Sequence, residues 1–313
     1  MTIGELGEFG LIARVTGRIG PAGHVELGPG DDSAVVTAPD GRVVASTDMY
    51  LEGSHFRRDW STATDIGHRV AAACLADIAA MGARATALLV GFGAPPDLEA
   101  SWSDELMQGL LEECTVAGAA IVGGDVVRSD KVILALTALG DLGGRAPVTR
   151  GGARDGDVVA VRGRLGWSAA GLAVLSHGFR SPRVLVDAHR RPVPPYAAGP
   201  EAADAGATAM CDVSDGLVQD LGHLAAAGGV AIDVTSAAFE VPEPFEQVAA
   251  ALGGADPLSW ILAGGEDHAL AATFPGEVGV PEGWLVVGRV SAGEGVTVDG
   301  ATYEGTGWDS FAD

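Results

Sequence analysis

The stretch that decides the fold is Gly28-Pro29-Gly30-Asp31-Asp32-Ser33-Ala34, which is followed by Ser46-Thr47-Asp48. These segments place three carboxylates and several hydroxyls in short turns bounded by glycine, beside apolar, strand-like runs. Carboxylate and hydroxyl oxygens are hard ligands that suit Mg²⁺, which also keeps open positions for water and phosphate. The stretch therefore predicts a metal site built from oxygen ligands.

Similar acidic positions recur along the chain, at Asp77, at Gly123-Gly124-Asp125 and at Asp212-Val213-Ser214-Asp215. One acidic turn is usually only a solvated turn, but five such clusters on one chain predict a site for several ions. Taken alone, Asp77 is better explained as a buried carboxylate held by hydrogen bonds than as a metal ligand.

Composition narrows the class of protein. The 313 residues suffice for two domains, and the hydrophobic fraction of 47% indicates a compact folded chain. The formal charge of −23 disfavours nucleic-acid binding, because phosphate backbones need a basic surface. Divalent cations would still allow a polyphosphate to bind, although the acidity is also explained by solubility alone.

The cysteines and the apolar runs bear on location. Cys74, Cys114 and Cys211 are widely spaced and form no CxxC pair, so buried free thiols are expected. The longest apolar run, 132–140, is too short to cross a bilayer. Acidic residues precede any apolar stretch at the N-terminus, which excludes an ordinary signal peptide. We therefore expect a cytoplasmic protein with no membrane partner.

Two common nucleotide-binding folds are disfavoured. The only lysine, Lys131, follows Ser129-Asp130, whereas a P-loop needs a lysine between a glycine-rich turn and a helix. No Gly-x-Gly-x-x-Gly run follows a strand and opens a helix, as a dinucleotide fold requires.

The apolar periodicity predicts a mixed α/β first half and an α/β second half. The first half is expected to contain strands over 42–47, 119–122 and 131–139 and helices over 61–81 and 104–117. The first strand should deliver Asp48 at its end, and the second should stop at Gly123. The second half is expected to contain strands over 158–161, 232–234 and 284–287, and a further strand that ends with residues 210–212. Its expected helices cover 167–176 and 217–227.

A glycine-rich and proline-containing segment over 140–157 predicts the boundary between the halves. We expect an N-terminal domain over 1–142 and a C-terminal domain over 150–313.

Taken in order, the motifs resemble those of the thiamine-monophosphate kinases, which share a fold with aminoimidazole ribonucleotide synthetase. The resemblance extends from Gly7 to Trp308. It is carried by Gly30-Asp31-Asp32, Ser46-Thr47-Asp48-Met49, Glu52-Gly53-Ser54-His55-Phe56, Asp77-Ile78-Ala79-Ala80-Met81-Gly82-Ala83, Gly123-Gly124-Asp125, Thr149-Arg150-x-Gly152-Ala153, Asp212-Val213-Ser214-Asp215-Gly216-Leu217 and Gly264-Gly265-Glu266-Asp267.

The resemblance implies a two-domain α/β (α+β type) aminoimidazole ribonucleotide synthetase-like fold, with a mixed N-terminal sheet, and a homodimer formed through the N-terminal domains. It implies direct transfer of the γ-phosphoryl group of ATP to thiamine monophosphate, giving thiamine diphosphate and ADP. The implied Mg²⁺ ligands are Asp32, Ser46, Thr47, Asp48, Asp77, Asp125, Asp212 and Asp215. The implied ATP contacts are Gly124, Asp125, Arg150 and Ser214, and the implied substrate contacts are His55, Glu266 and Trp308.

The acceptor in such a reaction is a phosphate monoester with a second pKa of roughly 6, so it is nucleophilic near neutral pH and no general base is assigned. Two positions depart from the family pattern. His268 stands where tyrosine is common, and Val126 stands where threonine is common.

Other readings stay open. The chain could be another ATP-dependent enzyme of this fold, or a Mg-nucleotide-binding regulator without activity. A selenophosphate synthetase is disfavoured, because it would carry a reactive cysteine near the N-terminus and the first cysteine here is Cys74.

Overall fold

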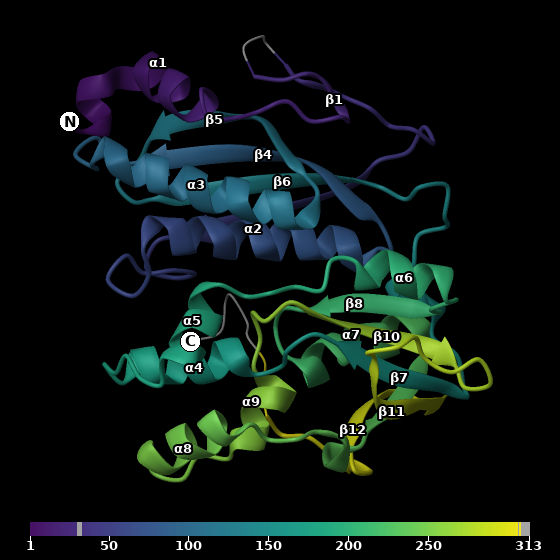
Figure 1. Cartoon of the computed structure of the whole chain (residues 1–313). Helices are drawn as coiled ribbons and strands as arrows, with labels where there is room; N and C mark the ends of the chain where they lie inside the picture. Colours follow the sequence, from purple (N-terminus) through teal and green to yellow (C-terminus); the bar gives the residue numbers. More distant parts are fainter. Residues whose placement is uncertain (30–32, 306, 308–313) are drawn as a thin grey trace. The chain divides into compact units, whose positions relative to one another are not determined.

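The computed structural model describes residues 1–29, 33–305 and 307, and Figure 1 shows the course of the chain. The chain divides into two compact units. Unit 1 comprises Met1–Ile78 and Ala83–Gly144, and unit 2 comprises Ala79–Gly82 and Arg145–Asp313.

Unit 1 is a mixed α/β unit. In chain order its elements are α1 (Ile3–Thr16), β1 (Val25–Leu27), β2 (Val35–Val36), β3 (Val44–Leu51), α2 (Ala63–Ala80, whose last two residues fall in unit 2), β4 (Arg84–Ala94), α3 (Ala100–Ala117), β5 (Ala120–Arg128) and β6 (Ile133–Asp141). Its main sheet has the order β3-β6-β4-β5, in which β4 and β5 are parallel and the other pairs are antiparallel. The expected mixed sheet is therefore confirmed, with α2 and α3 running along one of its faces (Figure 1).

Helices α2 and α3 pack closely because two glycines permit it. A Cβ atom on Gly67 would lie 2.3 Å from the backbone oxygen of Leu106, and one on Gly109 would lie 2.1 Å from that of Thr64. Both distances are shorter than any contact between real side-chain and backbone atoms, so a larger residue would force the helices apart.

Two expected strand ends are wrong. Asp48 lies in the middle of β3, because all eight residues of that strand, from Val44 to Leu51, pair with β6. Asp48 is half-buried, whereas its neighbours Thr47 and Met49 point to the other face and are exposed. The charged residue therefore belongs to the alternation of the strand and does not mark its end.

Likewise β5 does not stop at Gly123. Gly123 and Gly124 continue the parallel ladder opposite Leu89 and Val90. A Cβ atom on Gly124 would lie 2.0 Å from the Val90 oxygen, so glycine is required here by a close approach inside the sheet and not by a turn.

Unit 2 surrounds a seven-stranded sheet with the order β13-β12-β9-β11-β7-β10-β8. In chain order its elements are β7 (Asp157–Arg162), α4 (Trp167–Ser176), α5 (Arg183–Arg190), α6 (Ala198–Asp204), β8 (Ala209–Val213), α7 (Leu217–Gly228), β9 (Val230–Val234), α8 (Glu243–Ala251), α9 (Pro257–Ala263), β10 (Ala269–Pro275), β11 (Leu285–Ala292), β12 (Gly295–Val298) and β13 (Ala301–Thr302), with 3-10 turns η1 (Arg150–Gly152) and η2 (Ser236–Ala238). The β12–β9 pair is parallel, whereas the pairs that join β8, β10, β7, β11 and β9 are antiparallel.

The side chains that close the core of unit 2 are large and apolar. Phe274 packs edge-on against Trp284, with ring centroids 5.4 Å apart, in a buried cluster that includes Met210 and Leu270. Burial of such aromatic and aliphatic groups is the main stabilising term of the unit.

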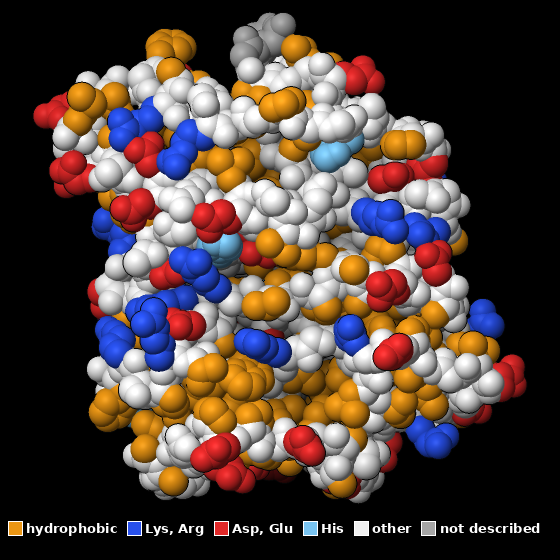
Figure 2. Space-filling view, in the orientation of Figure 1, with side chains coloured by type: hydrophobic (Ala, Val, Ile, Leu, Met, Phe, Trp, Pro, Cys, Tyr) orange, Lys and Arg blue, Asp and Glu red, His pale blue; other side chains and the backbone are white. Residues whose placement is uncertain are grey.

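The surface and the thiols follow the composition. Figure 2 shows acidic and basic side chains interspersed on the visible face, although the chain is strongly acidic. The expectation of buried free thiols is confirmed for Cys74, Cys114 and Cys211. No helix in the described part of the chain has both the length and the apolar sequence required to cross a bilayer.

Candidate active site

In unit 1, β3 and α2 bring together three of the implied metal ligands. Ser46 and Asp48 are two residues apart on β3, so both side chains lie on the same face of the strand. The Ser46 hydroxyl donates a hydrogen bond to Asp77 Oδ2 on α2 at 2.5 Å. We call these three half-buried residues, Ser46, Asp48 and Asp77, the strand cluster.

The strand cluster adjoins the buried Cys74 thiol. Burial raises its pKa most, and the nearby charges of Asp48 and then Asp77 raise it further. Two carboxylates and a hydroxyl in a half-buried position supply hard oxygen donors and a negative potential, which fits Mg²⁺. A cation there would also reduce the repulsion between the carboxylates.

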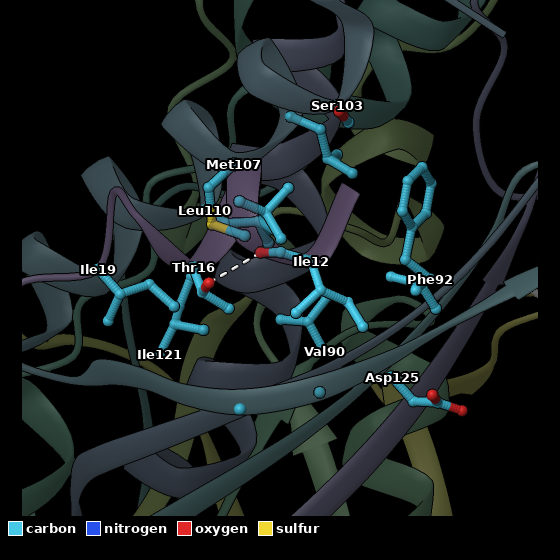
Figure 3. A pocket seen from close by; sticks show the side chains of 15 residues that line it. Ile12, Thr16, Ile19, Val90, Phe92, Ser103, Met107, Leu110, Ile121 and Asp125 are labelled. Atoms are coloured by element: carbon cyan, nitrogen blue, oxygen red, sulfur yellow. Dashed lines mark hydrogen bonds between the residues drawn. The ribbon is translucent and has the colours of Figure 1, made fainter. Parts of the chain in front are cut away.

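Two other implied ligands of unit 1 lie elsewhere. The Thr47 hydroxyl points to the opposite face of β3, where it donates to the Leu136 oxygen at 3.0 Å. Asp125 is on β5, separated from β3 by β6 and β4. Figure 3 shows its exposed carboxylate directed away from the pocket that Gly124 lines.

The implied substrate residue His55 is held in the turn that follows β3. Its Nδ1 accepts a hydrogen bond from the Leu51 N–H at 3.0 Å, so the ring proton resides on Nε2. Gly53 adopts a positive φ of 92°, and the Lys131 ammonium lies 3.9 Å from where its Cβ would stand. A neutral ring donor and a cation therefore flank this turn, an arrangement suited to an anion.

The turn is fastened to the sheet by Glu52. One of its oxygens accepts from the Val132 N–H at 3.1 Å, and the other accepts from Arg58 at 2.5 Å. The Glu52 carboxylate is thereby paired with a cation, and it stabilises the conformation of the turn.

An apolar pocket lies between α1, α3 and the β4–β5 edge of the sheet (Figure 3). It encloses about 90 Å³ and is lined mainly by aliphatic groups, among them Ile12, Leu106 and Ile121. Its two hydroxyl groups are already bonded: Thr16 donates to the Ile12 oxygen at 2.8 Å and Ser103 to the Ala100 oxygen at 2.6 Å. Gly123 and Gly124 form part of its wall, so the pocket adjoins the implied ATP contacts.

In unit 2, the end of β8 carries a second group of carboxylates. Asp212 is buried, with Oδ2 3.2 Å from His268 Nδ1. Asp215 follows in the loop, where burial and then the charge of Asp212 raise its pKa. We call Asp212, Asp215 and Asp220 the loop cluster. Their carboxylates supply hard oxygens and repel one another, so together they fit a divalent cation.

Asp220 lies on the first turn of α7 and was not predicted. Its Oδ2 accepts hydrogen bonds from the N–H groups of Asp215 and Gly216, both at 3.0 Å. Burial raises its pKa to about 7. Ligand atoms of Asp215, Asp220 and His223 lie within 4.8 Å of one another, so metal-ligating groups continue onto this helix.

The segment 264–268 is pressed against the loop cluster. The Glu266 N–H donates to the Ser214 oxygen at 2.8 Å, and a Cβ on Gly265 would lie 2.1 Å from that oxygen. Glu266 and His268 both have positive φ angles, 66° and 53°, which L-residues rarely adopt. The backbone of the half-buried Glu266 is thereby held beside Ser214.

Between these two residues, Asp267 was also missed. It is buried, and its Oδ1 accepts from the Ser168 N–H at 3.0 Å, at the start of α4, whereas Oδ2 has no hydrogen-bond partner among the residues that the structure describes. Burial raises its pKa to about 7. Asp267 thus acts as the N-terminal cap of a helix 99 residues earlier in the chain.

The remaining implied contacts are placed as follows. Arg150 is exposed on η1. Burial raises the pKa of the Cys211 thiol on β8, and the charge of Arg150 partly opposes that rise. Asp32 and Trp308 lie outside the described residues.

These features define a class. Residues 30–142 match the family model described as AIR synthase related protein, N-terminal domain, and residues 154–300 match the corresponding C-terminal domain. The chain is therefore an AIR synthase related protein, as its two-domain fold indicates. Within this class it belongs to the thiamine-monophosphate kinase family.

The relatives that show the family cover nearly the whole chain. Thiamine-monophosphate kinase of Mycobacterium tuberculosis is 51% identical, with 100% of this chain and 94% of the relative aligned. That of Corynebacterium glutamicum is 41% identical, over 99% and 95%. A solved structure described as AaThiL complexed with AMPPCP and TMP superposes with a TM-score of 0.82 at 32% identity, covering 99% of both chains.

Proposed function

We propose that this chain transfers the γ-phosphoryl group of ATP to thiamine monophosphate, giving thiamine diphosphate and ADP. The observation that carries the proposal is the strand cluster, a convergence of hard oxygens on β3 and α2 in a family whose members are named thiamine-monophosphate kinases. The AaThiL complex with AMPPCP, an analogue of ATP, and TMP supports the same pair of substrates.

The electrostatic difficulty of the reaction explains the acidic ligands. Two unit charges 4 Å apart repel by about 4 kcal/mol at an effective dielectric constant of 20, and the two substrates bring several charges together. Mg²⁺, when bound, offsets this repulsion and aligns the attacking and leaving oxygens. We propose that Ser46, Asp48 and Asp77 hold ions in unit 1 and that Asp212 and Asp215 hold them in unit 2.

The chain's own residues then bind and orient the phosphates. Arg150 offers a fixed positive charge for the triphosphate. His55 presents Nε2–H as a donor, because its Nδ1 is already engaged by the Leu51 N–H. The acceptor phosphate is nucleophilic without help, so no side chain is given the role of general base.

The apolar pocket is the proposed site of the adenine ring. It adjoins Gly123 and Gly124, and its aliphatic walls provide the contacts that a flat heteroaromatic ring favours.

We also propose a homodimer formed through unit 1. The face of the main sheet opposite α2 and α3 carries exposed apolar side chains, with Met49 at 68% and Val127 at 59% exposure. A second copy of this face would remove them from water. Sedimentation at micromolar concentration should give twice the mass of one chain, whereas a monomer would contradict this arrangement. The buried, unpaired thiols accord with a cytoplasmic location, where thiols stay reduced.

The direct test is incubation of the purified chain with ATP, Mg²⁺ and thiamine monophosphate, with the products separated by chromatography. We expect thiamine diphosphate and ADP in equal amounts, and neither product when EDTA removes the metal. ADP without thiamine diphosphate, or intact ATP, would refute the acceptor and direct attention to other ATP-dependent reactions of this fold.

A further inference from the structure

Tyr50 is a half-buried tyrosine that contacts the strand cluster and has no role in the proposed function. It lies on β3 two residues after Asp48 and therefore shares its face of the strand. The phenol hydroxyl donates a hydrogen bond to Asp48 Oδ2 at 3.2 Å. The hydroxyl thus contacts a carboxylate that the proposed function assigns to Mg²⁺.

The phenol hydroxyl bears on the orientation of the Asp48 carboxylate. A hydrogen bond to one oxygen restricts rotation of the carboxylate. Groups that orient a ligand in this way commonly govern metal affinity.

The ring of Tyr50 makes a second contact. It packs edge-on against His55, with centroids 6.0 Å apart and planes at 82°. The His55 ring also accepts a hydrogen bond at Nδ1 from the Leu51 N–H. Together these two contacts set the direction of Nε2.

We infer that Tyr50 is a positioning residue that couples the metal-binding carboxylate Asp48 to the acceptor-binding imidazole His55. This inference rests on the proposed function for the roles of Asp48 and His55. The hydroxyl acts on the metal ligand and the ring acts on the histidine, so the two halves of the side chain can be separated by substitution.

The hydroxyl is tested with Tyr50→Phe, which keeps the ring. We expect the affinity for Mn²⁺, measured from the loss of its free EPR signal, to fall about tenfold. In the kinase assay the Mg²⁺ concentration for half-maximal rate should rise equally, while the KM for thiamine monophosphate stays unchanged. Tyr303→Phe removes the same hydroxyl from unit 2 and should leave both quantities as in the wild type.

The ring is tested with Tyr50→Leu, which also removes the contact with His55. We expect the same weakening of Mn²⁺ binding and, in addition, a severalfold rise in the KM for thiamine monophosphate. A merely structural role would lower the thermal midpoint of unfolding without this separation of metal affinity from KM.

The outcomes separate this inference from the proposed function. If the wild type binds Mn²⁺ and Tyr50→Phe binds it equally well, the inference is overturned and the proposed function stands. If Tyr50→Phe weakens Mn²⁺ binding but no variant forms thiamine diphosphate, the link to Asp48 stands and the proposed reaction fails. An unchanged KM in Tyr50→Leu overturns the link to His55.

Discussion

The strand cluster and the loop cluster offer similar oxygens on two different kinds of backbone. In unit 1, Ser46 and Asp48 are presented by a regular strand, and hydroxyl groups are the hydrogen-bond partners of the carboxylates. In unit 2, Asp215 follows the end of a strand and Asp220 is held by two backbone N–H groups, against a segment with positive φ angles. The first cluster depends on strand alternation, and the second depends on the shape of a turn.

The comparison is broken most severely by removing one charge from each cluster. Asp48→Asn and Asp212→Asn each delete a proposed metal ligand while keeping its size. Because a bound metal contributes several kcal/mol to the transition state, we expect the rate of thiamine diphosphate formation to fall by about 10³-fold in each.

The circular-dichroism spectrum of both variants should match the wild type. Full activity in both would contradict the assignment of the clusters as metal sites. Full activity in only one would restrict the reaction to the ions of the other cluster.

A smaller effect is expected from the turn that supports the loop cluster. Gly265→Ala places a methyl group 2.1 Å from the Ser214 oxygen, which the backbone must move to relieve. We expect a loss of about 2–3 kcal/mol in the free energy of unfolding, measured in urea, together with reduced activity.

Gly222→Ala is the matched control for this substitution. Gly222 is inside α7, and its added methyl group meets no atom within 4 Å. This variant should gain about 0.5–1 kcal/mol, because alanine favours the helix. Equal stability of the two alanine variants would show that the turn tolerates a side chain.

The smallest effect concerns the pH dependence of unit 2. The pKa of Asp267 is about 7 in the folded chain, above its ordinary value of 3.8, so the folded state binds the proton more tightly. Its contribution to stability is complete below pH 4 and is lost as the pH rises through 7. Between pH 5 and 7 we expect this residue alone to remove about 2 kcal/mol.

Asp267→Asn should flatten the stability curve by that amount when unfolding is measured at several pH values in EDTA. Asp155→Asn, which changes an exposed carboxylate of the same unit, should leave the curve unchanged. A variant Asp267→Asn that follows the wild-type curve would show that this carboxyl does not control the dependence.

The sequence was most informative where local pattern determines structure. The helix expected over 167–176 is α4, because its apolar periodicity begins directly after Gly166. The strand boundaries around Asp48 and Gly124 were wrong, because pairing with neighbouring strands overrode the local polar and glycine signals.

The candidate site, like the fold, was predicted only in part from the sequence. The family resemblance supplied Ser46, Asp48 and Asp77 as candidate ligands, and the sequence placed Asp77 on the apolar face of its helix. The shared face of Ser46 and Asp48 and the hydrogen bond from Ser46 to Asp77 became visible only with the structure. The roles of Asp220 and Asp267 arise from hydrogen bonds that exist only after folding. For Asp267 the partner, Ser168, is 99 residues away, and no local pattern encodes such a contact.

The single lysine gives the molecule a specific site for amine labelling of its side chains. Lys131 is exposed, it is the only ε-amine among the 313 residues, and its ammonium lies beside Gly53 in the turn that carries His55. An amine-reactive dye would therefore attach at one known place on the side chains of this protein. Its emission would report occupancy of that turn, and among the side chains an amine-directed cross-link between two copies could join them only through Lys131.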